Sequence, residues 1–281
     1  MHPELQHAEL ENKVCLVAGA SGAIGCAVAE RFHAEGARLA LGSRTEAAAS
    51  CLAHRLDATR VLHLQFDVRS WHEVRDAVEK AHDRLGALDV LVNCTGMQGP
   101  IGPAHTAAPD EWARAIEVNL LGSFHLVRAA VPLMIARGGG KIIHFSGGGA
   151  AYARPFFSAY GASKAGVVRF TETLAEELRD ANIQVNTIAP GPVRSRMWDE
   201  MRAAGLAAGD KTLREIAEME QTGGVPPSRA AALALFLASP RSNGLTGRLI
   251  SGVHDSWEDF PGRISDIMKT EGGTLRRVPL G

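Results

Sequence analysis

The chain has 281 residues, of which 46% are apolar, and a net charge of −1 at neutral pH. This length suits one large α/β domain or two small ones, and the apolar fraction is ample for a substantial core. The near-zero charge gives no basic field for nucleic acid, so we expect no nucleic-acid partner.

The four cysteines are scattered without a CxxC pair, and the 11 histidines contain no HExxH motif. We therefore expect reduced thiols, a cytoplasmic location and no dedicated metal site. The first residues, Met1–Glu4, lack the charged and apolar blocks of a signal peptide. No uninterrupted apolar run approaches the roughly 18 residues of a membrane helix, so we expect no membrane span.

Apolar runs of five to seven residues predict seven strands: Lys13–Ala18, Ala37–Ser43, Val61–Phe66, Leu88–Asn93, Lys141–Ser146, Ile183–Ile188 and Arg248–Gly252. The stretches between them predict helices at Gly22–Glu35, Glu46–Asp57, Ser70–Leu85, Asp110–Ala136, Ala159–Arg179 and Ser228–Ala238. Strands that alternate with helices of this length predict an α/β fold, in which helices cover both faces of one doubly wound parallel sheet.

Two segments fall outside this alternation. Residues 193–224 are long, mixed and rich in methionine, and residues 254–281 form an extension beyond the last strand of a domain covering 1–253. The extension carries an apolar stripe made of Trp257, Phe260, Ile264, Ile267 and Met268. We expect it to fold over the active site, to cross to a neighbouring subunit, or to dock loosely as a terminal helix.

A glycine-rich turn separates the first predicted strand from the first helix. Glycines at such a turn let a pyrophosphate approach backbone N–H groups at the N-terminus of the helix. A turn with no ligand is the alternative, but the apolar strand before it and the helix after it favour a dinucleotide site. The residues that we expect to bind the cofactor here are Gly19, Ser21, Gly22, Ile24 and Gly25.

The end of the second predicted strand bears on the choice of cofactor. An NAD site usually places a carboxylate here for the ribose 2′-OH, whereas this chain has Ser43 and Arg44. Arginine pairs with a 2′-phosphate in bidentate fashion. The sequence therefore favours NADP(H), with NAD(H) as the alternative if Arg44 is an ordinary solvated arginine.

One of only two tyrosines stands four residues before a lysine in the segment Tyr160-Gly161-Ala162-Ser163-Lys164. Residues at this spacing share a helical face, and an ammonium group lowers the pKa of a nearby phenol from about 10. We therefore predict that Tyr160 exchanges protons near physiological pH. A surface tyrosine beside a solvated lysine is the alternative when the motif is considered alone.

With these features the chain resembles the short-chain dehydrogenase/reductase family, in its ordinary single-domain branch, from about Asn12 to Gly252. Further motifs of the family occur in the expected order. They are the pair Asp67 and Val68, the turn Asn93-Cys94-Thr95-Gly96, the asparagine Asn119, and the segment Asn186–Ser195 with Pro190, Gly191, Val193 and Ser195. The resemblance implies a Rossmann-type fold.

It also implies roles for these residues. Tyr160 would be the general acid and base, Lys164 would lower its pKa and bind the nicotinamide ribose, and Asn119 would hold a relay water. The pair Asp67 and Val68 would contact adenine, and the segment ending at Ser195 would hold the nicotinamide amide. The substrate would be a small carbonyl compound or alcohol under a lid at residues 193–224. Paired long helices would make a dimer or tetramer.

The expected activity is thus NADP(H)-dependent interconversion of a secondary alcohol and a ketone. An NAD-dependent dehydrogenase of a polyol, sugar or diol is one alternative, and a non-catalytic dinucleotide-binding regulator is another. Arg154, Phe156 and Phe157 are expected to line the pocket, and His144 to be a core histidine.

The chain departs from the family pattern in two places. Ala23 replaces the middle glycine of the first turn, with Gly22 one position earlier. The substrate-orienting serine of the family stands 13 residues before the tyrosine, where this chain has Gly147, preceded by Ser146. Since glycines permit backbone adjustment, we expect Ser146 to take the serine's role. The alternative is that Ser146 only ends a strand.

Overall fold

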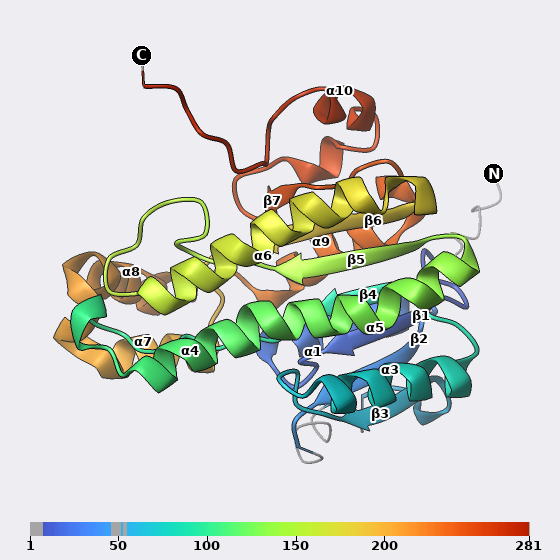
Figure 1. Ribbon diagram of the computed structural model, residues 1–281, viewed down its shortest axis with the longest axis horizontal. Helices are drawn as coiled ribbons and strands as arrows, with labels where there is room; N and C mark the ends of the chain where they lie inside the picture. The colour runs from blue at the N-terminus through green and yellow to red at the C-terminus, as the bar shows by residue number, and fades with distance from the viewer. Residues whose placement is uncertain (1–7, 46–51, 53–54, 281) are drawn as a thin grey trace.

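A seven-stranded parallel sheet forms the centre of the protein (Figure 1). The computed structural model describes residues 8–45, 52 and 55–280. The spatial order of the strands is β3-β2-β1-β4-β5-β6-β7. Their bounds are β1 (Val14–Ala18), β2 (Arg38–Ser43), β3 (Val61–Gln65), β4 (Val90–Asn93), β5 (Gly140–Phe145), β6 (Ile183–Ala189) and β7 (Leu249–Ser251). All seven predicted strands and the doubly wound fold are confirmed.

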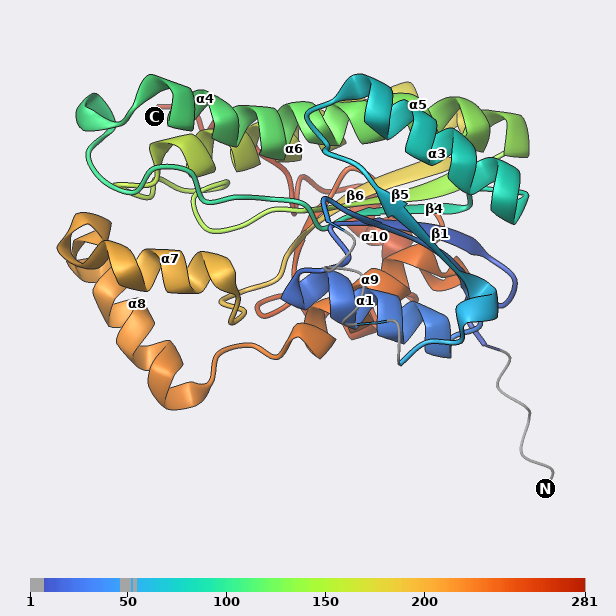
Figure 2. The same ribbon diagram turned by 90° about the horizontal axis from the view of Figure 1, so that it is seen from below.

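Helices cover both faces of the sheet (Figure 2). One layer holds α3 (Trp71–Leu85), α5 (Gly122–Arg137) and α6 (Ser158–Glu177), and the other holds α1 (Ala23–Ala34) and α9 (Pro227–Ala238). Short 3-10 helices are η2 (Ala58–Arg60), η3 (Ala104–Thr106), η5 (Arg179–Ala181) and η7 (Pro240–Ser242). The helix predicted at residues 46–57 lies mostly outside the described residues. The N-terminal residues 1–4 lie entirely outside them.

Because helices cover both faces of the sheet, its strands have apolar sequences. All five residues of β1 are buried, and alternate side chains enter different apolar clusters: Cys15 and Val17 face α1 and α9, whereas Leu16 and Ala18 face α3 and α5. A strand covered on both faces excludes water along its whole length, so its sequence is a continuous apolar run without polar alternation.

The helix predicted at residues 110–136 is continuous in space, but its middle turn is wider than an α-helix. It begins as α4 (Pro109–Ile116), passes through a π-helix, η4 (Glu117–Leu121), and continues as α5. Single π turns inside α-helices occur frequently at functional sites, and this one contains Asn119. Within the described residues, Pro109–Arg137 is also the one helical stretch with the length and mean hydropathy of a membrane span, and 44% of its apolar window is buried.

The segment after β6 leaves the two layers. It forms α7 (Arg196–Ala204), the 3-10 helix η6 (Gly205–Ala208) and α8 (Gly209–Thr222), which project together from one end of the molecule (Figures 1 and 2). The strand arrow of β5 points toward this end. The carboxyl ends of the parallel strands therefore face α7 and α8, and ligands of such sheets bind at this edge.

The C-terminal extension packs on its own subunit. The 3-10 helix η8 (Trp257–Asp259) and α10 (Ile264–Met268) carry the predicted apolar stripe against the core beside α9. The ring centroids of Phe236 and Trp257 are 5.9 Å apart. In the described chain the stripe therefore packs on the core beside α9.

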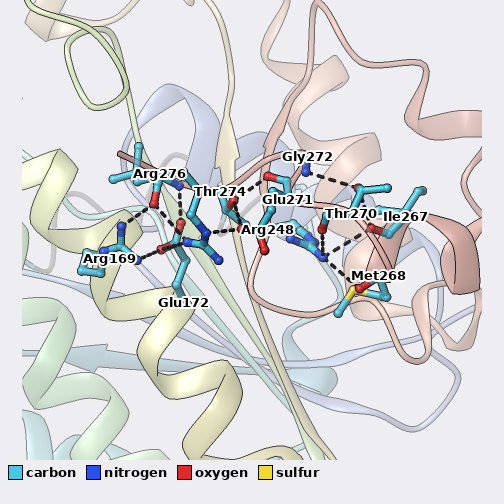
Figure 3. Close-up of polar contacts among 11 residues, drawn as sticks. Arg169, Glu172, Arg248, Ile267, Met268, Thr270, Glu271, Gly272, Thr274 and Arg276 are labelled. Carbon is cyan, nitrogen blue, oxygen red and sulfur yellow. Dashed lines mark hydrogen bonds and ion pairs between the residues drawn. The ribbon is translucent and has the colours of Figure 1, made fainter. Parts of the chain in front are cut away.

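Polar contacts fasten the last part of this extension beside β7 (Figure 3). Leu249 N donates to Gly273 O at 2.7 Å, so the chain covers the edge of the last strand. Arg248, on the neighbouring backbone, donates to the carbonyl of Thr270 at 2.9 Å. Glu172 of α6 is 8% exposed at its side chain and is paired with Arg169 and Arg276. These contacts make the extension an integral part of this face of the sheet.

Candidate active site

The glycine-rich turn after β1 is a backbone cradle that two glycines make possible. Gly19 has a φ of 78°, and a β-carbon there would lie 2.9 Å from the carbonyl carbon of Cys94. A β-carbon on Gly25 would lie 2.2 Å from the oxygen of Gly19. Both positions exclude any side chain, because real β-carbons do not approach backbone atoms this closely.

The other members of the turn have different roles. Gly22 caps the start of α1 with a φ of −78°, and a β-carbon there would be an ordinary 3.5 Å from Gly19 O. Ala23 opens the helix in place of the family glycine, Ile24 packs on the core, and Ser21 is exposed. The first turn of α1 has no acidic residue. Free N–H groups at such a helix start suit a phosphate, so the cradle fits the predicted dinucleotide.

The residues predicted to meet the adenosine part lie at the ends of β2 and β3. Ser43 Oγ donates to Thr45 O at 2.8 Å, and Asp67 is held by Arg69, whose Nη2 lies 2.7 Å from Asp67 Oδ2. Hydrogen bonds from Arg69 hold the pKa of Asp67 below its usual range. Among described residues the exposed Arg44 side chain has no hydrogen-bond or ion-pair partner, so its guanidinium is available for an anion. Val68 is buried, and its carbonyl accepts from His125.

The turn after β4 is tied to the π-helix by buried amide groups. Asn93 Oδ1 accepts from Thr95 N at 3.0 Å, and its Nδ2 donates to Ser123 Oγ at 2.9 Å. Asn119 Nδ2 donates to Met97 O at 3.0 Å, while Met97 N donates to Asn119 Oδ1 at 2.9 Å. Asn93 and Asn119 thus hold the shape of this turn.

Gly96 lies where these elements meet α6. A β-carbon on Gly96 would be 3.4 Å from Asn119 Oδ1 and 3.4 Å from Lys164 Nζ. Asn119 Nδ2 also donates to Ser163 Oγ at 2.8 Å, and Ser163 Oγ donates to Tyr160 O at 2.8 Å. The fold therefore gathers Gly96, Asn119 and Lys164, as predicted. Ser163 is an addition, for which its position inside the Tyr160–Lys164 motif was the available signal.

Tyr160 and Lys164 occupy one face of α6, as their spacing predicts. The Lys164 Nζ lies 5.9 Å from the centroid of the Tyr160 ring and donates to Phe145 O at 2.8 Å. Both residues are buried. The surface alternative for this motif is therefore wrong.

The titration of Tyr160 differs from the sequence-based expectation. Burial raises the pKa of Tyr160 to about 12, and the cation that opposes this rise is Arg154. Burial lowers the pKa of Lys164 to about 8. The proximity of Lys164 alone therefore does not bring Tyr160 near physiological pH in this structure, because the loss of solvent around the phenol outweighs the neighbouring charge.

Gly147, and not Ser146, faces the Tyr160 hydroxyl. A β-carbon on Gly147 would lie 2.2 Å from that oxygen. Ser146 N still donates to Ile188 O at 2.8 Å, so the chain is extended here and neighbouring residues point to opposite faces. Ser146 Oγ is buried without a hydrogen-bond partner among the described residues. The expected substrate-orienting role of Ser146 has no support in this geometry.

His144 is a core residue, as expected. It is fully buried on β5, and burial lowers the pKa of its imidazole to about 3. Neither ring nitrogen has a hydrogen-bond partner among the described residues, so the side chain is neutral in the folded protein.

The segment after β6 begins at the same edge of the sheet. Pro190 is buried, and Gly191 has a φ of 80° and would place a β-carbon 2.5 Å from Val253. Val193 is buried, and Ser195 precedes the first turn of α7. These residues bring the chain from the carboxyl end of β6 into α7 and α8.

A third apolar cluster connects α7 and α8 to the catalytic candidates. It contains Phe157, Tyr160, Trp198, Met201, Ala208, Ile216 and Met219. The preceding loop contacts α8 through Phe156, whose ring would meet a β-carbon on Gly209 at 2.5 Å. Arg154 stacks on the ring of Phe157 at 4.2 Å and pairs with Glu215 of α8 at 3.0 Å. The sequence analysis named Arg154, Phe156 and Phe157 but missed Glu215, which lies in a charged helix with no distinguishing motif.

Comparisons with known proteins show which family and which solved structures the chain resembles. Residues 13–205 match the family model described as short chain dehydrogenase. The chain is 33% identical over 245 residues to the 3-oxoacyl-(acyl-carrier-protein) reductase of Thermotoga maritima, covering 86% of this chain and 96% of that protein. It is 31% identical to the D-beta-hydroxybutyrate dehydrogenase of Rhizobium meliloti, covering 85% and 96%. A gluconate 5-dehydrogenase from Burkholderia cenocepacia, solved in complex with NADP and tartrate, superposes with a TM-score of 0.77 at 29% identity, covering 89% and 96%.

Proposed function

The chain belongs to the short-chain dehydrogenase family, and on that premise we propose that it interconverts a secondary alcohol and a ketone with NADP(H), using Tyr160 as general acid and base. The observation that carries the proposal is the position of the Tyr160 hydroxyl. It lies beside Gly147 at the carboxyl edge of the sheet, in the apolar cluster of α7 and α8, one helical turn from Lys164.

The cofactor assignment rests on the cradle and on Arg44. The pyrophosphate would lie against the backbone at Gly19 and Gly25, where side chains are excluded, and the 2′-phosphate would pair with the available Arg44 guanidinium. The solved gluconate 5-dehydrogenase contains NADP. When bound, the nicotinamide supplies or accepts the hydride. NAD(H) remains the alternative, coupled to a polyol, sugar or diol.

In this proposal, residues of this chain hold the proton and transfer it to the substrate. With a pKa of about 12, Tyr160 carries its proton at neutral pH and donates it to the carbonyl oxygen during reduction. Among the described residues, Phe145 O is the one hydrogen-bond acceptor of Lys164 Nζ, so its remaining N–H groups are available to ribose hydroxyls. Asn119 maintains the turn at Gly96 that borders Lys164. The segment 193–224 excludes water from the pocket as a substrate lid.

The glycine opposite Tyr160 favours a second candidate. Without a serine at position 147, the pocket lacks the usual donor to the developing oxyanion, and such a donor is typically worth about 3 kcal/mol. A non-catalytic protein that binds a dinucleotide as a regulator would need no such donor. The complete set of Tyr160, Lys164 and Asn119 favours the enzyme.

The test is turnover of reduced nicotinamide. Purified protein with NADPH and a panel of ketones should consume the cofactor, measured by its absorbance, and Tyr160→Phe should lower the rate by about 100-fold or more. Thr173→Val is the control, since it removes a hydroxyl from an exposed position of the same helix, α6. Cofactor binding without turnover of any ketone, or unchanged turnover in Tyr160→Phe, would contradict the enzyme assignment.

We also propose a homo-oligomer, a dimer or tetramer, assembled through the long helices. The outer side of η4 and α5 exposes Leu121, Phe124 and Ile135, with 40%, 39% and 51% of each residue accessible. Light scattering should give a multiple of the 29.8 kDa chain mass, and a monomer at micromolar concentration would contradict this.

A further inference from the structure

Arg154 is a largely enclosed cation beside the Tyr160 pocket. Its side chain is 13% exposed and stacks on Phe157, a member of the apolar cluster. Its Nη2 is 3.0 Å from Glu215 Oε2 and 3.7 Å from the sulfur of Met201. Glu215 is 39% exposed, and an ion pair that is open to solvent contributes little to stability, so the enclosed position of Arg154 calls for another explanation.

The guanidinium also has unused donors. Arginine has five N–H groups, and only those on Nη2 have a hydrogen-bond partner among the described residues. Nε and Nη1 have no such partner, and neither is sealed from solvent. A β-carbon on Gly148 would lie 3.1 Å from Nη1 and 3.0 Å from the Tyr152 hydroxyl, so the glycine lets both groups pack against the backbone here.

The position of Arg154 relative to Tyr160 indicates which kind of ligand reaches both residues. The Tyr160 hydroxyl faces Gly147, and Arg154 Nη1 faces the next residue, Gly148. Arg154 contacts Phe157 and Met201, which belong to the same apolar cluster as Tyr160, and its charge acts on the Tyr160 phenol, so the two groups border one site. A molecule that places a carbonyl oxygen at Tyr160 can therefore extend an anionic group to Arg154.

We propose that Arg154 binds a carboxylate of the substrate, so that the enzyme acts on keto acids and the corresponding hydroxy acids. This inference rests on the proposed function, since it assigns the substrate of the same pocket. Arginine and carboxylate form paired, charge-assisted hydrogen bonds, and these orient a ligand as well as bind it. Glu215, which is 39% exposed on α8, holds the guanidinium when no substrate is bound and competes with the substrate carboxylate.

The test measures binding directly. Protein saturated with NADP⁺, or with NAD⁺ if that binds more tightly, is titrated calorimetrically with 4-oxopentanoate and with its methyl ester, a neutral analogue. The oxidised cofactor prevents reduction of either ketone. The wild type should bind the acid more tightly than the ester. Arg154→Met should lower this acid-to-ester preference by about 10- to 100-fold, the range expected for hydrogen bonds to a charged group.

Further variants separate binding from folding. Glu215→Gln removes the competing carboxylate and should strengthen acid binding, whereas Arg154→Lys keeps the charge but loses the paired geometry and should be intermediate. Arg202→Met is the matched control, because Arg202 lies on α7 with 58% of its side chain exposed and should leave the preference unchanged. Thermal melting verifies that each variant is folded.

The inference is overturned if the wild type binds acid and ester equally, or not at all, or if Arg154→Met retains the preference. A ketophosphonate of the same length that binds more tightly than the acid would also overturn the carboxylate assignment. These results are distinct from failure of the proposed function. That failure appears as the absence of NADPH turnover with every ketone tested, neutral or acidic, while calorimetry still reports whether Arg154 selects the acid.

Discussion

Two alanine substitutions in the same turn test the cofactor cradle. In Gly25→Ala, the new β-carbon would lie 2.2 Å from Gly19 O and 2.9 Å from the α-carbon of Ala20. Both are backbone atoms, so the turn itself must shift. In Gly22→Ala, the nearest atom is 3.5 Å away and φ is −78°, a conformation that alanine adopts without strain.

The two substitutions should have different effects on the free energy of unfolding and on cofactor binding. Inserting a carbon into a packed site typically costs about 1–3 kcal/mol, so Gly25→Ala should lower the Tm by about 2–6 °C. It should also weaken NADP(H) binding by about tenfold or more, because the turn that receives the pyrophosphate is displaced. Gly22→Ala should change stability by less than about 1 kcal/mol, since the restriction of the unfolded chain by alanine is offset by its poorer capping of α1.

The assays are thermal melting without cofactor and titration of NADPH by its fluorescence. Gly22→Ala is the control for Gly25→Ala, since it adds the same methyl group three residues away. The reasoning is refuted if the two variants lose stability and affinity to the same extent, or if Gly25→Ala binds NADPH like the wild type.

Four other outcomes follow from the structure. Arg44→Asp should shift the ratio of kcat/KM values from NADP(H) toward NAD(H), because a carboxylate repels a 2′-phosphate; an unchanged ratio contradicts the assignment. Ser146→Ala should lower kcat by less than about tenfold, since Ser146 Oγ has no hydrogen-bond partner among the described residues; a larger loss would restore its catalytic role. The depressed pKa of His144 means that the unfolded chain binds the extra proton first, so stability present above about pH 6.5 is lost as pH falls toward 3. His144→Leu should flatten this loss in denaturation curves measured across that range, and an unchanged slope would refute it. Glu172→Gln should release the extension from Arg276 and speed its limited proteolysis, and an unchanged cleavage rate would show that the pair does not hold it.

Much of the fold follows from local patterns. Buried strands such as β1 and β5 must be apolar throughout, and the helices between them bury one face, so alternation along the chain implies a parallel sheet covered on both sides. The glycines of the first turn and the spacing of Tyr160 and Lys164 indicate chemistry for a similar reason. Both requirements are local in the sequence. A tight turn needs residues without side chains, and two side chains share a helical face when they are four residues apart.

The substrate side could not be predicted in the same way. Sequence distance to Tyr160 left Ser146 and Gly147 as neighbouring candidates, and only the direction of the extended chain after β5 assigns Gly147 to the hydroxyl. The pKa of Tyr160 was predicted from one neighbouring charge. Its value depends on everything that excludes water from the ring, including residues of α7 and α8 about 40 to 60 positions away in the sequence.

The amino-acid sequence by itself determined the layered α/β architecture, the glycine-rich turn after β1 and the tyrosine–lysine pair, because periodicity and short spacing encode them directly. Tertiary structure alone decided that position 147 faces the phenol, that Arg154 meets Glu215, and that the C-terminal extension covers β7. The physical reason is that these contacts join segments far apart in the chain. Their geometry and solvent exposure are defined only once the sheet and its helices are packed.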